Sequence, residues 1–201
     1  NGSVQMILTQ ILQPTCIKAP LDSTDKESAI EALVQLLAHS GQLTNSQDAF
    51  QAIMDRAQQR STGIGSGIAI PHGKCASAKE LVMAMGIMKD PIDFESIDGK
   101  PVKIIVLLVS PLDCTGPHIQ ALARISRLML DETFKAKLEK AGSVEIEIYD
   151  LIGSLVLADA FSAAAGTNTR EIDITTIPNG TYLIKLESGG DVYVFKAVVV
   201  K

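Results

Sequence analysis

Hydrophobic positions in the first part of the chain follow helical spacing in several places. One helix face is marked by four apolar residues, Ile30, Leu33, Val34 and Leu37. A capping box of the form T-x-x-E begins this helix at Thr24, and Gly41 ends it. A second helix is predicted to begin at Ser46, and residues 117–130 and 132–140 show the same periodicity. We therefore predict four helices in this part of the chain.

Strand-like runs lie between these helices. They cover residues 68–70, 81–88 and 102–109. The last run is almost continuously apolar, as expected of a strand that is covered on both faces. Because strands alternate with helices, we predict an α/β domain over residues 1–142, with a mixed sheet flanked by helices on both faces.

The pattern changes at about residue 143. Apolar and acidic residues alternate over 144–148, and a similar alternation returns at 172–174. Turns rich in glycine, asparagine and proline precede two further β-type runs at 181–186 and 192–200. We therefore predict a second domain over residues 143–201, a small all-β, sandwich-like module.

The segment from Arg56 to Lys74 carries the candidate chemistry. It reads R-A-Q-Q-R-S-T-G-I-G-S-G-I-A-I-P-H-G-K. Imidazole is a good nucleophile near neutral pH, because a reference pKa of about 6.5 leaves much of it unprotonated. His72 is therefore a candidate acceptor of a phosphoryl group. Pro71 favours extended backbone at Ile70, so we expect His72 at the end of a strand.

The residues before this histidine suit an anionic ligand. Ser61 and Thr62 supply hydroxyl donors, while Gly63 and Gly65 let backbone N–H groups converge on phosphate oxygens. Arg56 adds a guanidinium group to neutralise charge. The alternative is a simple turn with a hydrogen-bonded histidine, because the glycine spacing matches neither a P-loop nor G-x-G-x-x-G. The residues alone leave both interpretations open.

A family resemblance favours the phosphoryl interpretation. The segment S-T-G-I-G-S-G-I-A-I-P-H-G-K and the downstream H-I-Q-A-L-A-R-I-S-R-L closely resemble the enzyme IIA proteins of the phosphoenolpyruvate-dependent sugar phosphotransferase system, of the fructose, mannitol and nitrogen-regulatory branch. The likeness extends over about residues 6–140. It implies that His72 accepts the phosphoryl group, that Arg56 neutralises its charge and that His118 orients the first histidine. One departure is Ala57, where the family usually has glutamate.

The last part of the chain resembles another family. The segments I-E-I-Y-D-L-I-G-S-L-V, I-D-I-T-T-I-P-N-G-T-Y-L-I-K-L and V-Y-V-F-K-A-V-V-V-K are similar to the C-terminal sorting domain of type IX secretion cargo. Such domains usually begin with two further strands that contain Pro-Asn-Pro, which is absent here, and a generic β-meander is the alternative. Residues 141–152 also resemble the last helix of an enzyme IIA, but their alternation favours a strand.

Composition restricts the classes of function. A net charge of −5 and the lack of a basic run argue against a nucleic-acid partner. The longest apolar run, residues 104–109, is too short for a membrane span. Three widely spaced cysteines predict neither a disulfide framework nor a metal site, so we expect a reducing compartment and no cofactor. Asn1-Gly2-Ser3 resembles an expression remnant before a natural start near Met6.

The two resemblances imply different functions. The first implies a phosphotransferase in the cytoplasm, which receives phosphate from the histidine phosphocarrier protein and passes it to a IIB component or a regulatory target. The second implies an alternative function, an export module for the cell surface that the type IX secretion machinery recognises, carried on an inert or regulatory enzyme IIA domain. Because a protein cannot serve both in the cytoplasm and at the cell surface, we interpret the chain as an engineered fusion with enzyme IIA as its scaffold. An open sheet edge in the tail would also permit a dimer.

Overall fold

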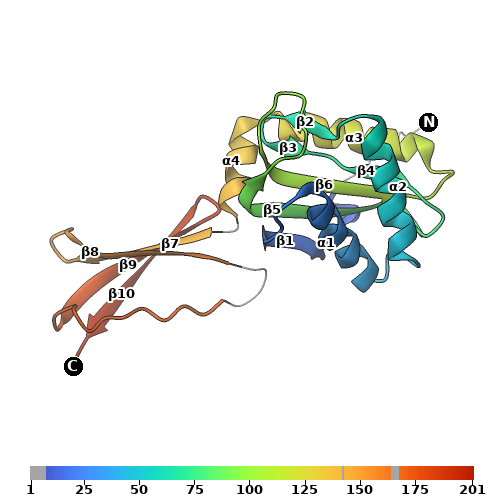
Figure 1. Cartoon of the computed structure of the whole chain (residues 1–201). Helices are drawn as coiled ribbons and strands as arrows, with labels where there is room; N and C mark the ends of the chain where they lie inside the picture. The colour runs from blue at the N-terminus through green and yellow to red at the C-terminus, as the bar shows by residue number, and fades with distance from the viewer. Residues whose placement is uncertain (1–7, 142, 164–167) are drawn as a thin grey trace, which may run out of the picture. The chain divides into compact units, whose positions relative to one another are not determined.

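The chain forms two compact units, residues 1–135 and 136–201. The structure, a computed structural model, describes residues 8–141, 143–163 and 168–201 (Figure 1). The start expected near Met6 and the predicted domain end at residue 142 therefore lie outside the described residues. Each unit contains its own sheet, and the two are described separately below.

The first unit contains a mixed six-stranded sheet. Its strands are β1 (Leu12–Leu21), β2 (Gly63–Gly65), β3 (Ile68–Ala69), β4 (His72–Lys74), β5 (Val82–Ile92) and β6 (Val102–Ser110). Their order is β1-β5-β6-β3-β2, and β4 also pairs with β6. The long strands β5 and β6 are antiparallel, whereas β1 runs parallel to β5, and β3 and β4 run parallel to β6.

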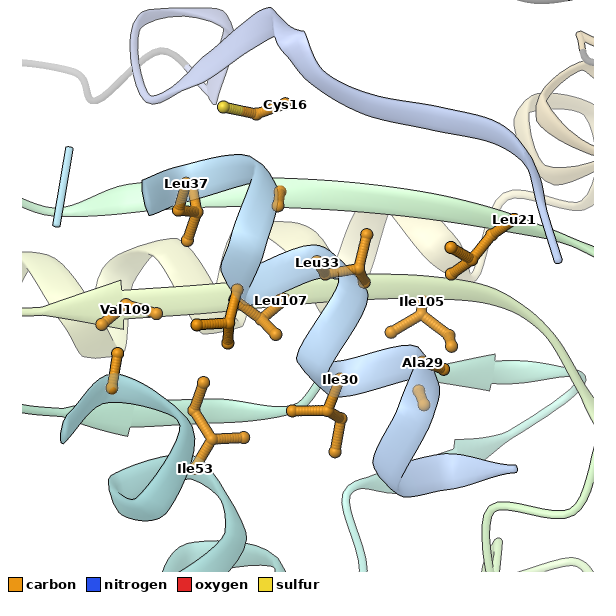
Figure 2. Close-up of a cluster of buried hydrophobic side chains, with 14 of the residues drawn as sticks. Cys16, Leu21, Ala29, Ile30, Leu33, Leu37, Ile53, Ile105, Leu107 and Val109 are labelled. Carbon is orange, nitrogen blue, oxygen red and sulfur yellow. The ribbon is translucent and has the colours of Figure 1, made fainter. Parts of the chain in front are cut away.

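Helices cover both faces of this sheet, as predicted. They are α1 (Lys26–His39), α2 (Ser46–Gln59) and α3 (Thr115–Met129). A short 3-10 helix, η1 (Leu8–Gln10), precedes β1, and α4 (Glu132–Lys140) follows α3 at the boundary between the two units. Helix α1 packs against β1 and β5 on one face, and α3 lies behind β6 on the other (Figures 1 and 2). Burial of β6 on both faces explains its almost continuous apolar sequence.

The core between α1 and the sheet consists of interlocking aliphatic side chains (Figure 2). Ile30, Leu33 and Leu37 of α1 are fully buried, as the helical spacing predicts. They pack in one cluster with Ile105 and Leu107 of β6. Burial of each such side chain contributes roughly 1.5–3 kcal/mol. This cluster fixes β6, along which the site strand β4 is aligned.

The beginning of α1 differs by one residue from the prediction. Asp25, not Thr24, is the N-cap, and its carboxylate accepts a hydrogen bond from the backbone N–H of Ser28 at 2.8 Å. A carboxylate also interacts favourably with the positive end of the helix dipole, which explains why Asp25 takes this place. Helix α2 begins at Ser46 as predicted, and Asn45 is its N-cap.

Strand β1 was not predicted. It contains Pro14 and Pro20, which normally argue against a strand because proline lacks a backbone N–H donor. In the structure β1 lies at the edge of the sheet and has only β5 as a neighbour, with irregular register. An edge strand tolerates the missing donors.

The second unit is a four-stranded antiparallel sheet with the order β10-β9-β7-β8. Its strands are β7 (Ser143–Asp150), β8 (Leu155–Ser162), β9 (Gly180–Ser188) and β10 (Asp191–Val199). The preference for a strand over a terminal enzyme IIA helix at residues 141–152 is thus confirmed for residues 143–150. Strand β7 has a hydrogen-bonded neighbour on each side.

In the described part of the tail, residues 143–163 and 168–201, the strands form one sheet rather than the two of a sandwich. The β-like alternation at residues 172–174 does not produce a strand, because this segment forms no ladder. Instead, irregular chain packs on the sheet, with Ile177 buried against Ile148 and Tyr182. The Tyr182 hydroxyl donates a hydrogen bond to the carbonyl oxygen of Pro178 at 2.9 Å. Irregular chain therefore covers part of the sheet where a sandwich would have a second sheet.

Ending the chain at Ala141 should leave the first unit folded. The strands β1 to β6 and the helices α1 to α3 all precede this cut, and so does their shared core. We expect the shortened chain to retain a cooperative thermal transition in circular dichroism, with the full chain as control. A shortened chain without such a transition would show that residues 143–152 belong to the first unit.

Candidate functional site

His72 lies at the start of β4 and is half-buried. Strand β4 pairs with β6 so that His72 is opposite Leu108, whose N–H donates to the carbonyl oxygen of Pro71 at 3.0 Å. Gly73 allows α2 to approach, because a Cβ atom at this position would lie 3.0 Å from the backbone nitrogen of Ile53. The sequence Pro-His-Gly therefore holds the histidine between the sheet and α2.

A backbone hydrogen bond orients the His72 ring. Its Nδ1 lies 2.8 Å from the carbonyl oxygen of Ile70. Because a carbonyl oxygen only accepts hydrogen bonds, Nδ1 carries the proton and Nε2 carries the lone pair. Burial lowers the pKa of His72, the hydrogen bond to Ile70 partly offsets this, and the charge of Arg56 adds a smaller decrease. The ring is therefore neutral and nucleophilic at pH 7.

His118 lies on α3 beside the first histidine. The ring centroids of His72 and His118 are 5.7 Å apart, with an angle of 60° between the planes. His118 is buried, and its Nδ1 shares a 2.7 Å hydrogen bond with the hydroxyl of Ser110 at the end of β6. Burial lowers the pKa of His118 to about 4, and the charges of His72 and Lys74 add to this decrease. The second ring is therefore neutral as well.

The three predicted catalytic residues line one pocket of about 410 Å³. Its lining includes Arg56 from α2, His72 from β4 and His118 from α3. Arg56 lies in the last turn of α2, where Nη1 donates to the carbonyl oxygen of Arg60 at 3.4 Å. Three residues that are far apart in the sequence thus meet in one cavity.

The four residues expected to bind phosphate do not line this pocket. The hydroxyl of Ser61 donates to the carbonyl oxygen of Glu95 at 2.6 Å and accepts from the N–H of Gly63 at 3.2 Å. Thr62 is buried, and Gly63 and Gly65 lie in β2, which pairs with β3. These residues build the turn that leads to the site, so the geometry gives no support to their expected phosphate contact.

Three further residues belong to the site. Lys74 lines the pocket and donates to the hydroxyl of Thr115 at 2.6 Å. Ser110 bonds His118, as described above. Lys74 could have been found from the sequence, because it is two residues from His72 on the same strand and so lies on the same face. The contacts of Thr115 and Ser110 depend on how α3 packs against β4 and β6.

This arrangement suits nucleophilic attack on phosphorus. A neutral imidazole presents a lone pair to a pocket that also contains a permanent cation, Arg56. Preorganised positive charge stabilises the negative charge of a transferring phosphoryl group. Across residues 8–141, 143–163 and 168–201, no group of three metal-ligating side chains occurs and no helix is long and apolar enough to cross a membrane.

Curated proteins of two kinds are similar to this chain. A nitrogen regulatory protein of Klebsiella oxytoca is 34% identical over 155 residues, which cover 76% of this chain and 93% of that protein. The PTS system fructose-specific EIIABC component of Bacillus subtilis is 38% identical over 147 residues. That match covers 73% of this chain but only 23% of the relative, so the chain spans about a quarter of its length.

Solved structures share the fold of the first unit. The nitrogen regulatory protein IIA-Ntr of Neisseria meningitidis has a TM-score of 0.61 and 29% identity, over 65% of this chain and 88% of its own. The complex of enzyme IIAMTL with phosphorylated enzyme IIBMTL from Escherichia coli gives a TM-score of 0.52 at 18% identity. The match covers 60% of this chain and 83% of that chain. At that identity the likeness shows the fold alone.

Family models match both parts of the chain. The model described as "Secretion system C-terminal sorting domain" matches residues 131–201, which confirms the resemblance of the tail. The model described as "Phosphoenolpyruvate-dependent sugar phosphotransferase system, EIIA 2" matches residues 10–154 and thus most of the chain. The two matches overlap where α4 and β7 lie. Because the EIIA 2 model matches most of the chain and the nitrogen regulatory relative is 34% identical, this chain belongs to the EIIA 2 family of the phosphotransferase system.

Proposed function

We propose that this protein carries a phosphoryl group on Nε2 of His72. The observation that supports this most strongly is the 2.8 Å hydrogen bond between Nδ1 and the carbonyl oxygen of Ile70, which leaves the lone pair on Nε2. No described residue has a hydrogen bond to Nε2. A neutral histidine with a protonated, hydrogen-bonded Nδ1 and a lone pair on Nε2 is suited to reversible phosphorylation.

The proposed donor is the phosphohistidine of the small histidine phosphocarrier protein. Nε2 of His72 attacks the phosphorus atom, and the P–N bond to the donor ring breaks as the new P–N bond forms. The donor imidazole leaves with the electron pair, and the proton on Nδ1 of His72 stays in its hydrogen bond to Ile70. Arg56 stabilises the negative charge on the phosphoryl oxygens during this exchange.

His118 has a positioning role in this proposal. Its ring lies 5.7 Å from that of His72, centroid to centroid, and its hydrogen bond to Ser110 holds it in place. Because its pKa is about 4, it adds no positive charge at pH 7 that would compete with Arg56 for the phosphoryl group. We infer that His118 limits the orientations of the His72 ring.

The proposed acceptor is a IIB component or a regulatory target. A IIB acceptor is suggested by the related complex with phosphorylated enzyme IIBMTL, and transport by the name of the fructose-specific relative. A regulatory use is suggested by the nitrogen regulatory relatives, of which this chain covers a much larger share. Both uses require the same phosphohistidine and a cytoplasmic location.

The tail supports a second candidate function, that of a sorting signal for export. Its match to a secretion sorting domain and its separate sheet favour recognition by the type IX secretion machinery at the cell surface. A cytoplasmic phosphocarrier gains nothing from such a signal. We therefore favour an engineered fusion in which the EIIA domain is the scaffold.

Replacement of His72 by glutamine should abolish phosphorylation. Glutamine keeps a polar side chain of similar length but lacks a nucleophilic nitrogen. We expect the purified full chain to gain the mass of one phosphate when incubated with phosphoenolpyruvate, enzyme I and the histidine phosphocarrier protein. His72→Gln should gain none while it retains the same thermal transition.

His39→Gln is the matched control, because His39 ends α1 and bonds the carbonyl oxygen of Gln35. It should accept phosphate like the parent protein. The label on His72 should be lost in acid and survive base, as phosphoramidates do. A label that persists in His72→Gln, or an acid-stable label, would contradict the assignment of His72.

The tail sheet also supports a dimer. Strand β10 is the outer strand of the sheet and has large exposed apolar residues on both faces. Edge strands usually carry charges or prolines that prevent pairing, whereas β10 has charge only at Asp191 and Lys196. We propose that β10 pairs with β10 of a second copy.

Sedimentation analysis over a dilution series tests this pairing. The full chain should dimerise, and Val194→Lys, which places a charge at the middle of β10, should shift it to monomer. Val156→Lys on β8, the opposite edge of the sheet, is the matched control and should leave the dimer intact. A full chain that stays monomeric at all concentrations, or a dimer that is insensitive to Val194→Lys, would rule out pairing through β10.

A further inference from the structure

Lys74 shares the phosphoryl pocket with His72. The two residues are separated by one position on β4, so their side chains lie on the same face of the strand. Gly73 between them is buried against α2 and has no side chain. Both Lys74 and His72 line the pocket of about 410 Å³ that also contains Arg56 and His118.

The position of the Lys74 ammonium group is fixed by α3. Its Nζ donates to the hydroxyl of Thr115, the first residue of that helix, at 2.6 Å. Across the described ranges, no carboxylate forms an ion pair with Lys74. A hydroxyl group orients an ammonium group without neutralising it. The full positive charge of Lys74 is therefore available to an anion in the pocket.

The electrostatics of the second histidine support this position. The charge of Lys74 contributes to the lowered pKa of His118, after burial and the charge of His72. The ammonium group of Lys74 is therefore close enough to influence a histidine ring that lines the pocket. Such an effect requires proximity, because exposed charges that are further apart are screened by salt.

The charges of the pocket match a phosphoryl group. Both histidines are neutral at pH 7, because burial lowers the pKa of each. Of the described residues that line the pocket, Arg56 and Lys74 are the two with basic side chains other than the histidines. A phosphoryl group carries about −1.5 to −2 charges at this pH. Arg56 alone leaves part of that charge uncompensated, whereas Arg56 and Lys74 together balance it.

We propose that Lys74 is a second catalytic cation, which moves from the hydroxyl of Thr115 to the phosphoryl oxygens during transfer to His72. The inference rests on the proposed phosphocarrier function. In the unphosphorylated protein Thr115 holds the ammonium group at the wall of the pocket that His72 also lines. When the P–N bond to Nε2 forms, the ammonium group contacts an equatorial oxygen of the phosphoryl group, and it returns to Thr115 when the phosphoryl group leaves.

Single-turnover transfer from the labelled histidine phosphocarrier protein tests this role. Lys74→Met removes the charge but keeps most of the aliphatic stem, and it should slow transfer by about 10²-fold, the effect of losing one preorganised donor. Lys74→Arg should retain most of the rate. Thr115→Val keeps the shape of the residue but frees the ammonium group, and it should slow transfer by a smaller factor.

Lys18→Met is the matched control, because Lys18 is an exposed residue of β1 and does not line the pocket. It should transfer at the parent rate. Transfer at the parent rate by Lys74→Met would overturn the proposal. A parent protein that accepts no phosphate at all would instead contradict the proposed function.

An NMR titration of His118 gives a readout that is independent of transfer. The pKa of His118 is about 4 in the parent protein, and removal of the neighbouring positive charge should raise it in Lys74→Met. The same rise is not expected in Lys18→Met. An unchanged pKa in Lys74→Met would show that the ammonium group does not face the pocket, even if transfer is impaired.

Discussion

The chemistry of the first unit depends on the hydrogen bond between Nδ1 of His72 and the carbonyl oxygen of Ile70. This bond assigns the proton to one nitrogen and the lone pair to the other, so the ring needs no separate base for the proposed attack on phosphorus. The bond exists because Pro71 extends the backbone at Ile70, and because β4 is held along β6 by the N–H of Leu108. Burial of β6 in the core therefore fixes the position of β4, and with it the hydrogen bond that orients His72.

Much of the fold could be predicted from local patterns, because its helices and long strands bury one or two complete faces. The apolar spacing in α1 and the continuous apolar run of β6 both appear in the core. Strand β1 was missed because its prolines argue against a strand, and only its edge position makes them acceptable. Within the region shared by the two family matches, residues 143–150 were predicted correctly as a strand, since alternation of isoleucine and glutamate has a period of two.

The candidate site was only partly predictable. His72 and Arg56 were candidates from their own chemistry, and His118 from the family resemblance; the structure brings all three to one pocket. Ser61 and Thr62 were expected to face phosphate, but a glycine-rich loop has many conformations, and here the hydroxyl of Ser61 bonds backbone groups while Thr62 is buried. The contacts of Thr115 and Ser110 arise where α3 meets β4 and β6, which no local spacing encodes.

The central claim is that Nε2 of His72 is the nucleophile, and nitrogen-15 NMR of the histidine rings tests it most directly. In the unphosphorylated protein the His72 ring should be in the tautomer with its proton on Nδ1, in agreement with the hydrogen bond to Ile70. After phosphorylation, phosphorus-31 coupling should appear at Nε2, with Nδ1 still protonated. A tautomer with the proton on Nε2, or phosphate on Nδ1, would contradict the account.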